Sequence, residues 1–277
     1  QALYVEHDPQ EILRSVKKTL KTLLASAAKN REVRVGLACQ RSSFLLVDAR
    51  SHQPLTPVLS WQDTRGMEVV GLMSRHSDEI NRQTGLYLTP YYMLSKLLWL
   101  FHKNHDMRQK AERGQILLAP LPSYIAAALT GQKKLAVDPT HAQRSLLMNL
   151  ATCQWDAGLL NTFRIPADIL PEIKDTSDDY GSIALPGLAM PIKLGAMIGD
   201  QQAAYLALRQ NQTPATGLIN LGTGGFLLLP TGASPQRFSG LLTGVLNKTQ
   251  GTTEYMLEGT VTSIQGIFLW LKSLGLL

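Results

Sequence analysis

The chain has 277 residues, 44% of them hydrophobic and 17% charged, which is typical of a globular protein with one large domain or two ordinary ones. Its net charge of +6 comes without a long basic run interleaved with aromatics, so we expect no nucleic-acid partner, although an anionic small substrate such as a nucleotide would suit it. No apolar run approaches the ~18 residues of a membrane span, no signal peptide opens the chain, and Cys39 and Cys153 have neither metal-ligand spacing nor a disulfide framework. We therefore expect a cytoplasmic protein with no membrane partner.

The first half of the chain predicts alternating helices and strands. Asp8 and Pro9 mark a helix start, because Asp caps well and Pro suits the first helical position, and apolar residues then recur at helical spacing as far as about Lys29. Short apolar runs bounded by turn residues predict strands. The predicted strands cover residues 33–38, 44–47, 57–60 and 116–119; the other predicted helices begin at Thr89-Pro90, cover residues 122–129, and begin at Trp155-Asp156.

A Gly- and Pro-rich stretch at residues 180–193 predicts a domain boundary near residue 195. We therefore expect a first domain over residues 1–194 and the start of a second domain over residues 195–277. In the second, the pattern predicts strands over 196–198, 217–221, 226–229, 241–246 and 254–257, and helices over 201–208 and 261–274. Helices mixed with β-hairpins in both halves indicate an α/β protein of two domains, not a simple Rossmann unit.

Two segments of the second domain suggest phosphoryl transfer. A Gly-Thr-Gly-Gly turn at residues 222–225 joins two predicted strands, and glycine there allows positive φ and close approach of backbone N–H groups to a phosphate. Such a turn is more often only a hairpin. Asp200 follows a predicted strand and precedes an alanine-rich helix, so it either caps that helix or deprotonates an attacking hydroxyl, and the two roles are compatible. Together, the turn and the carboxylate favour a kinase.

Other polar and aromatic residues stand at strand ends. Arg41 lies at a strand bend, where its guanidinium could hold a hydroxyl or a phosphate, or form a surface ion pair. Trp61 is either a core residue or a platform for a sugar, and Asp63 and Arg65 could pair with each other. The six histidines are dispersed and predict no metal site.

Taken in order along the chain, several motifs resemble those of the FGGY carbohydrate kinases, most closely the glycerol kinase branch. The Gly-Asp-Gln-Gln run and the Gly-Thr-Gly turn are the most specific of them. The matching pieces are Val5-Glu6-His7-Asp8-Pro9, Cys39-Gln40-Arg41, Trp61-Gln62-Asp63-Thr64-Arg65, Pro90-Tyr91-Tyr92 with Lys96 and Trp99, Gly199-Asp200-Gln201-Gln202-Ala203-Ala204, Gly222-Thr223-Gly224-Gly225-Phe226 and Leu257-Glu258-Gly259.

The resemblance implies the ribonuclease-H-like two-domain fold of the sugar kinase, heat-shock protein and actin superfamily, with ATP and Mg²⁺ bound beside a sugar or polyol. It implies that Asp200 is the general base and that Gly222, Thr223 and Gly224 touch the phosphates of ATP; it names no metal ligand in this chain and leaves a homo-oligomer open. The substrate site that it implies consists of Gln40, Arg41, Ser42, Trp61, Tyr91, Asp200, Gln201 and Phe226.

The chain departs from the family pattern in three places. Glycerol kinases carry a glutamate where this chain has Ser42, so we expect a roomier pocket and a substrate larger than glycerol. The family's first phosphate hairpin is expected before Gln1 and its adenosine site after Leu277, so we expect a fold that is incomplete at both ends and belongs to a longer kinase.

Two alternatives to a carbohydrate kinase stay open. One is a non-catalytic relic or fragment that holds a polyol but transfers nothing. The other is an actin-like or chaperone-like ATPase on the same superfold, which the lining by Arg41, Trp61 and Tyr91 disfavours because a conformational switch needs no sugar pocket.

Overall fold

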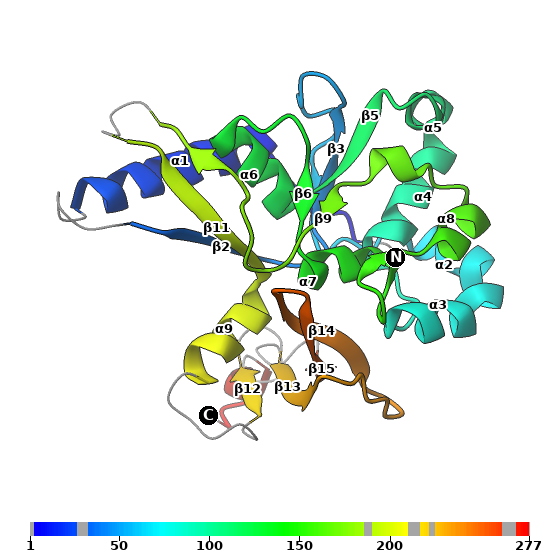
Figure 1. The fold of residues 1–277 in the computed structure, drawn as a ribbon. Coiled ribbons are helices and arrows are strands. Elements are labelled where there is room, and N and C mark those ends of the chain that lie inside the picture. Colours follow the sequence, from blue (N-terminus) through cyan, green and yellow to red (C-terminus); the bar gives the residue numbers. More distant parts are fainter. Residues whose placement is uncertain are drawn as a thin grey trace.

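The computed structural model describes residues 3–26, 33–185, 190–209, 217–221, 225–261 and 270–276 (Figure 1). A larger part of the fold contains the elements from β1 to β11, and helix α9 leads from it into a smaller part built on the last sheet (Figure 1). Parallel and antiparallel strand pairs, with helices on the faces of the sheets, confirm the α/β prediction. None of the helices in the described ranges is long and apolar enough to cross a bilayer.

The main sheet of the larger part is antiparallel and separates two apolar cores. Strand β3 shows why: all four of its apolar side chains are fully buried, Leu45 and Val47 in one core and Phe44 and Leu46 in the other. A strand without a solvent-facing side is expected where both faces of a sheet are covered. The strands run in the order β1 (Glu6–His7), β4 (Val58–Leu59), β3 (Phe44–Asp48) and β5 (Ile116–Pro120).

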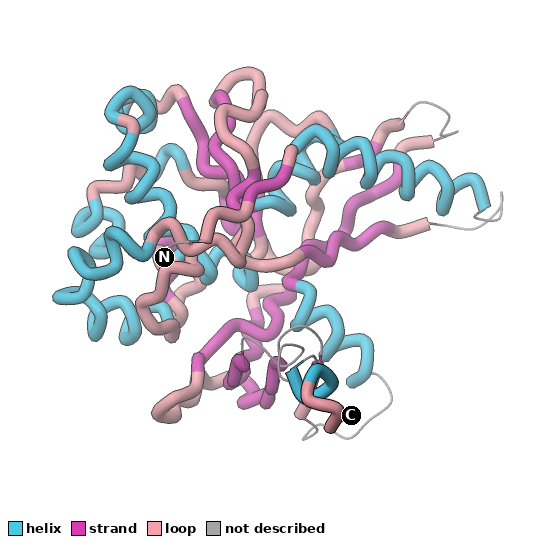
Figure 2. The backbone as a smooth tube through the Cα atoms, turned by 180° about the vertical axis from the view of Figure 1, so that it is seen from behind, coloured by secondary structure: helices cyan, strands magenta, loops and turns pink. Residues whose placement is uncertain are grey.

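Helices cover the two faces of this sheet (Figure 2). Helices α1 (Pro9–Ser26) and α6 (Leu121–Thr130) contribute to the core with Leu45. The core with Phe44 is built by helices α2 (Met67–Met73), α3 (Ser77–Thr84), α4 (Met93–Lys103), α5 (His105–Glu112) and α8 (Ala157–Phe163). The remaining short elements are η1 (Ser74–His76), α7 (Pro139–Ala142), η2 (Gln143–Ser145), η3 (Ala167–Ile169), the parallel pair β6 (Ala136–Val137) and β9 (Glu172–Ile173), and the hairpin β7 (Met148–Asn149) and β8 (Gln154–Trp155).

A second sheet of the larger part positions the site. Strand β11 (Ile192–Gly199) pairs antiparallel with β10 (Ser182–Ile183) and parallel with β2 (Val35–Cys39), and Gly199 lies opposite Cys39. The two parallel strands therefore end at the same edge. The expected division between residues 194 and 195 falls inside β11 and stays a prediction.

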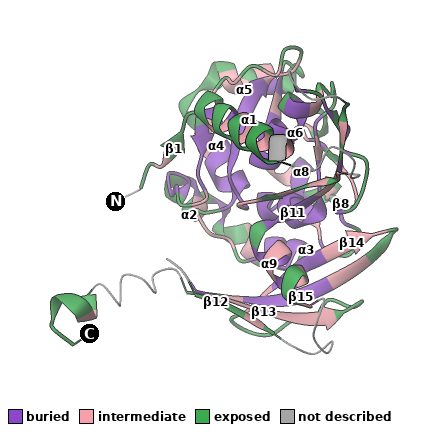
Figure 3. Ribbon diagram, turned by 90° about the vertical axis from the view of Figure 1, so that its left-hand side faces the viewer, coloured by how far each residue is buried: buried purple, intermediate pink, exposed green. Residues whose placement is uncertain are grey.

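The smaller part consists of α9 (Asp200–Arg209) and an antiparallel sheet. Its strands run in the order β12 (Leu218–Leu221), β13 (Gly225–Gly232), β15 (Thr252–Val261) and β14 (Leu242–Thr249), which confirms the predicted strands and lengthens three of them. Its buried apolar core is Tyr205, Leu228, Leu246 and Met256, whereas most buried residues of the molecule lie in the larger part (Figure 3).

One helix prediction needs adjustment, and two others run partly outside the described residues. The helix expected from Thr89-Pro90 begins at Met93, because Tyr92 is extended and Ser95 donates its hydroxyl to the carbonyl oxygens of Pro90 and Tyr92. The helix expected over residues 261–274 cannot be followed, since 262–269 lie outside the described residues; Val261 ends a strand and residues 270–273 are helical. The first helix matches its predicted start, and the end predicted near Lys29 is likewise outside the described ranges.

Candidate active site

The ends of β2 and β11 bring two predicted segments together. Arg41 follows β2, and Asp200 follows β11 directly as the first residue of α9. A Cβ at Gly199 would lie 2.8 Å from Cδ of Arg41. The segment with Gly199 and the segment with Arg41 are therefore too close together for any residue larger than glycine at position 199. Ligands of open α/β sheets bind beyond the carboxyl ends of parallel strands, which is where these side chains stand.

A buried polar network fixes both strand ends from behind. The Thr140 hydroxyl donates to Oδ2 of Asp138 at 2.7 Å and accepts from the backbone N–H of Gly199 at 2.7 Å. His141 lies between Oδ1 of Asp138, at 2.6 Å, and the carbonyl oxygen of Cys39, at 3.2 Å. All three side chains are fully buried. Helix α7 thus holds the last residue of each strand, which sets the positions of Arg41 and Asp200.

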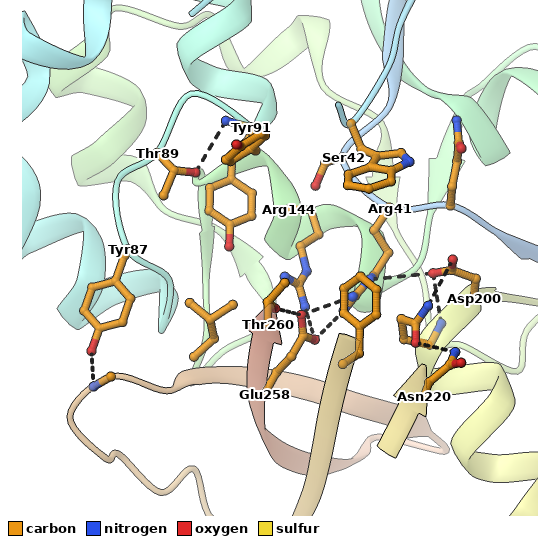
Figure 4. Close-up of a pocket in the computed structure, with 17 residues that line it drawn as sticks. Arg41, Ser42, Tyr87, Thr89, Tyr91, Arg144, Asp200, Asn220, Glu258 and Thr260 are labelled. Atoms are coloured by element: carbon orange, nitrogen blue, oxygen red, sulfur yellow. Dashed lines mark hydrogen bonds and ion pairs between the residues drawn. The ribbon is translucent and has the colours of Figure 1, made fainter. Parts of the chain in front are cut away.

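A cavity of about 520 Å³ lies at this edge, between the larger part and the last sheet (Figure 4). It is lined by every residue of the predicted substrate site, namely Gln40, Arg41, Ser42, Trp61, Tyr91, Asp200, Gln201 and Phe226. The predicted phosphate turn, Gly222 to Gly224, lies outside the described residues, so its position stays a prediction.

Arg41 is the centre of a buried ion-pair cluster. Its guanidinium makes two parallel contacts with Glu258, Nη1 to Oε2 at 2.5 Å and Nη2 to Oε1 at 3.1 Å, while its Nε lies 3.8 Å from Oδ1 of Asp200 (Figure 4). The guanidinium carbon stands 5.9 Å from the centre of the Phe226 ring. Arg41 is therefore a buried ion-pair partner, not a surface one.

Sequence analysis assigned no role to two residues of this cluster, Glu258 and Arg144. Arg144 also donates to Oε2 of Glu258, at 2.7 Å, and the Glu258 side chain is only 1% exposed. Burial alone would raise the pKa of this carboxyl, but the charges of Arg144 and Arg41 and their hydrogen bonds outweigh it and lower the pKa to about 2. The signal in the sequence is a glutamate within an apolar strand, since a buried carboxylate needs a partner.

Asp200 offers what Glu258 does not, an accessible carboxylate. Its side chain is 47% exposed, and Oδ1 accepts from the backbone N–H of Gln201 at 2.9 Å. The Gln201 amide is oriented by Asn220, whose Nδ2 donates to Oε1 of Gln201 at 3.0 Å. An accessible carboxylate with an oriented amide beside it can receive a proton from a bound hydroxyl.

Two residues behind the cavity, Ser43 and Lys96, connect the segments that carry Gln40, Ser42 and Trp61. The hydroxyl of Ser43 accepts from the backbone N–H of Trp61 at 2.9 Å and from Nε2 of Gln40 at 3.0 Å. The ammonium of Lys96 donates to the carbonyl oxygens of Ser60, at 2.7 Å, and Ser42, at 3.3 Å. Lys96 is fully buried, and this burial lowers its pKa to about 7. The strand-end segments that carry Ser42 and Trp61 are thereby fixed to each other.

The described residues form no cluster of three or more His, Cys, Asp or Glu side chains that could hold a metal ion. Of the two carboxylates that line the described cavity, Glu258 is occupied by two arginines and Asp200 is accessible. Mg²⁺ in kinases is held by one or two carboxylates together with substrate phosphates, so a single accessible carboxylate fits a metal that arrives with its nucleotide.

Comparison with known proteins identifies the family of the chain. Residues 1–207 match the FGGY family of carbohydrate kinases, N-terminal domain. Glycerol kinases from Thermus brockianus and Bradyrhizobium sp. (strain ORS 278) are 37% and 34% identical to 99% and 97% of the chain, which covers 56% and 55% of their lengths. The chain thus spans little more than half of these relatives.

Solved structures give the same answer for the fold. A Plasmodium falciparum glycerol kinase with ADP superposes with a TM-score of 0.89 at 28% identity, covering 99% of this chain and 56% of that one. A gluconate kinase from Lactobacillus acidophilus superposes with a TM-score of 0.81 at 22% identity, over 97% of this chain and 54% of that one, which is a likeness of fold alone. The chain therefore belongs to the FGGY family of carbohydrate kinases, with the fold of the actin-like ATPase superfamily.

Proposed function

We propose that the protein is a cytoplasmic carbohydrate kinase that uses ATP and Mg²⁺ to phosphorylate one hydroxyl of a sugar or polyol bound in the cavity. The observation that carries this proposal is the accessible carboxylate of Asp200 beside Arg41, in a cavity lined by all the residues that the family resemblance assigns to the substrate. Membership of the family supports the reaction class.

Asp200 accepts the proton of the reacting hydroxyl, which raises the nucleophilicity of that oxygen. Arg41 holds the Asp200 carboxylate in place by charge across 3.8 Å, while its other nitrogens are held by Glu258. Gln201, oriented by Asn220, donates to the substrate next to the reacting oxygen. ATP, which we expect at Gly222 to Gly224, supplies the phosphoryl group when bound with Mg²⁺.

Replacement of the base tests the proposal. In the full-length protein, Asp200→Asn should lower kcat by at least ~10²-fold, the range for a lost general base, with a much smaller change in the dissociation constant of the polyol. ADP release in the presence of triols, pentitols, ketopentoses and ketohexoses measures kcat, and calorimetry measures binding. Asp168→Asn, at an exposed position of η3, is the matched control and should leave both quantities unchanged.

The same assays separate the alternatives. Polyol binding without ADP release by the wild type identifies a non-catalytic binding protein. ADP release that no sugar or polyol stimulates identifies an ATPase of the actin or chaperone type. Near-normal turnover of Asp200→Asn contradicts the assignment of the base.

A further inference from the structure

Helix α7 carries a fully buried histidine that faces an oxygen atom on each side. Nδ1 of His141 lies 2.6 Å from Oδ1 of Asp138, and Nε2 lies 3.2 Å from the carbonyl oxygen of Cys39. A carbonyl oxygen only accepts hydrogen bonds, so Nε2 must carry a proton. Whether Nδ1 carries a second proton depends on whether Asp138 is ionised.

The hydrogen bonds around Asp138 favour an ionised carboxylate. The hydroxyls of Thr140 and Thr176 each accept from a backbone N–H, that of Gly199 at 2.7 Å and one of β14 at 3.2 Å. Their own protons are therefore free to point to Oδ2 of Asp138, at 2.7 and 3.3 Å. The backbone N–H groups of Thr140 and His141 also donate to the carboxylate, at 3.1 and 3.3 Å. Donors on both oxygens stabilise the charged form of a carboxyl group.

His141 is the counter-charge of this carboxylate. Asp138 is fully buried, and the ion pair that the described residues give it is the one with His141. A buried carboxylate without a counter-charge is strongly unfavourable. Since the ionised Asp138 can only accept, Nδ1 must donate as well as Nε2. Both ring nitrogens then carry protons, and the ring is an imidazolium.

Two other titratable groups lie beside this pair, and neither carries a charge. Burial and the charge of Asp138 raise the pKa of Tyr180, which packs against the same core. Burial and the charge of Asp200 raise the pKa of the Cys39 thiol to about 12. Both groups therefore stay neutral near pH 8, so the charges of this buried network are those of Asp138 and His141.

We propose that His141 is a positioning residue that acts as an imidazolium. Its two protons join Asp138 to the last carbonyl group of β2, two residues before Arg41. Thr140 joins the same carboxylate to the last N–H group of β11, one residue before Asp200. The ion pair of Asp138 and His141 thereby sets the position of Arg41 relative to Asp200. A neutral ring would turn a nitrogen lone pair toward one of the two oxygens, and the repulsion would displace a strand end.

NMR of the full-length protein with ¹⁵N-labelled histidine tests the protonation state, whether or not the protein is a kinase. At pH 8 a histidine of ordinary pKa, about 6.5, is neutral, whereas both ring nitrogens of His141 should show the chemical shift of a protonated nitrogen. The signals that disappear in His141→Gln identify the residue, and the exposed His105 is the internal reference for a histidine in solvent. An unprotonated ring nitrogen in His141 at this pH overturns the imidazolium.

Removal of the counter-charge sharpens the same measurement. Asp138→Asn should leave His141 with one unprotonated ring nitrogen, because the positive charge has lost its partner. Asp168→Asn, at an exposed position of η3, is the matched control and should leave both nitrogens protonated. Thermal melting verifies that each variant is folded, and the wild-type spectrum decides the protonation state if Asp138→Asn is not.

Turnover tests the positioning role, which rests on the proposed function. His141→Gln keeps a donor but no charge and should lower kcat about 10- to 100-fold, since a misplacement of ~1 Å can cost 10²-fold. The dissociation constant of the polyol should rise by a smaller factor. Asp138→Asn should behave alike, and the double variant should lose no more than either single one, because the two residues act as a unit. Asp168→Asn should keep the wild-type kcat.

The outcomes separate this inference from the proposed function. Wild-type kcat in folded His141→Gln overturns the positioning role even if the ring is an imidazolium. Effects of His141→Gln and Asp138→Asn that multiply in the double variant overturn the pair as a unit. A wild-type protein that releases no ADP with any sugar or polyol overturns the proposed function instead. The spectrum then still decides the state of His141, and an unchanged polyol dissociation constant in His141→Gln overturns its positioning role.

Discussion

The two walls of the cavity are built differently. The wall with Gln40, Arg41, Ser42 and Trp61 belongs to the larger part, where two extensive apolar cores and the ties of Ser43 and Lys96 lie behind it. The wall with Phe226 and Glu258 belongs to the last sheet, whose buried apolar core has four residues and whose strands expose Ile219, Leu221 and Val261 by 67%, 65% and 55%. The first wall is therefore supported by extensive packing behind it, whereas the second depends on its junction with the first.

That junction is polar. Glu258 joins Arg41 and Arg144 across it, and the Gln143 side chain donates to the carbonyl oxygens of Thr84 and Thr243, each at 2.7 Å. Charged and amide groups hold a geometry well only while every partner is present, since an unpaired buried polar group is strongly unfavourable. The relative position of the two walls therefore rests on a few side chains.

Of the substitutions that test this difference between the walls, removal of the Glu258 charge should change the free energy of unfolding most. Glu258→Gln removes the carboxylate that pairs with Arg144 and leaves Arg41 only the more distant Asp200, so it should lower the free energy of unfolding by about 3–5 kcal/mol, as measured by urea denaturation. Glu254→Gln, which weakens a half-exposed pair with Arg209, is the matched control and should lower it by less than ~1 kcal/mol. Equal effects would show that the junction does not depend on the buried pair.

The same carboxylate gives the stability a pH dependence at low pH. The folded pKa of Glu258, about 2, lies below its ordinary value of 4.5, so the unfolded chain binds the proton more readily. The stabilisation is complete above pH ~4.5 and is lost as the pH falls toward 2. The free energies of unfolding of wild type and Glu258→Gln should therefore converge in this interval; parallel profiles would contradict the lowered pKa.

The sequence predicted the strands of both walls, because local patterns describe strands and their ends. Apolar periodicity located β2, β3 and β11, and the polar residues that follow β2 and β11 do meet in one cavity. Helices α3 and α5 went unpredicted, since their sequences are mostly polar and they bury few side chains. Periodicity has no signal where a helix touches the core at one or two positions.

The hydrogen bonds and ion pairs that support the two walls could not be predicted for a different reason. Arg41 and Glu258 are 217 residues apart in sequence, and the Lys96 ammonium reaches Ser42 and Ser60 from another element. Lysine is almost always exposed, so its presence on an apolar helix indicates a solvated edge until the fold shows otherwise. Long-range pairing of polar side chains depends on tertiary packing that a single sequence does not contain.

Lys96 tests whether the first wall is supported by a buried ammonium group. Its substitution should have an intermediate effect on the free energy of unfolding. Its folded pKa of about 7 lies below the ordinary 10.5, so between these values the unfolded chain binds more protons and stability rises with pH. The slope should exceed that of Lys96→Met by up to about 1.4 kcal/mol per pH unit, because one proton is involved. Urea denaturation at several pH values between 7 and 10 measures both slopes. Lys110→Met, at a half-exposed position of α5, is the control and should keep the wild-type slope. Identical slopes for wild type and Lys96→Met would mean that Lys96 is solvated.

The smallest expected effect concerns Ser43, which fixes Trp61 to Gln40 within the first wall. Ser43→Ala deletes the acceptor of the Trp61 backbone N–H and should lower the free energy of unfolding by about 1–2 kcal/mol. It should also weaken polyol binding, since both residues line the cavity, whereas Ser182→Ala, exposed in β10, should change neither quantity. Denaturation and calorimetry on the same preparations distinguish the two effects. If stability falls while polyol affinity is unchanged, the first wall does not need the hydrogen bonds of Ser43 to keep its shape. The apolar cores behind it are then sufficient to maintain that shape.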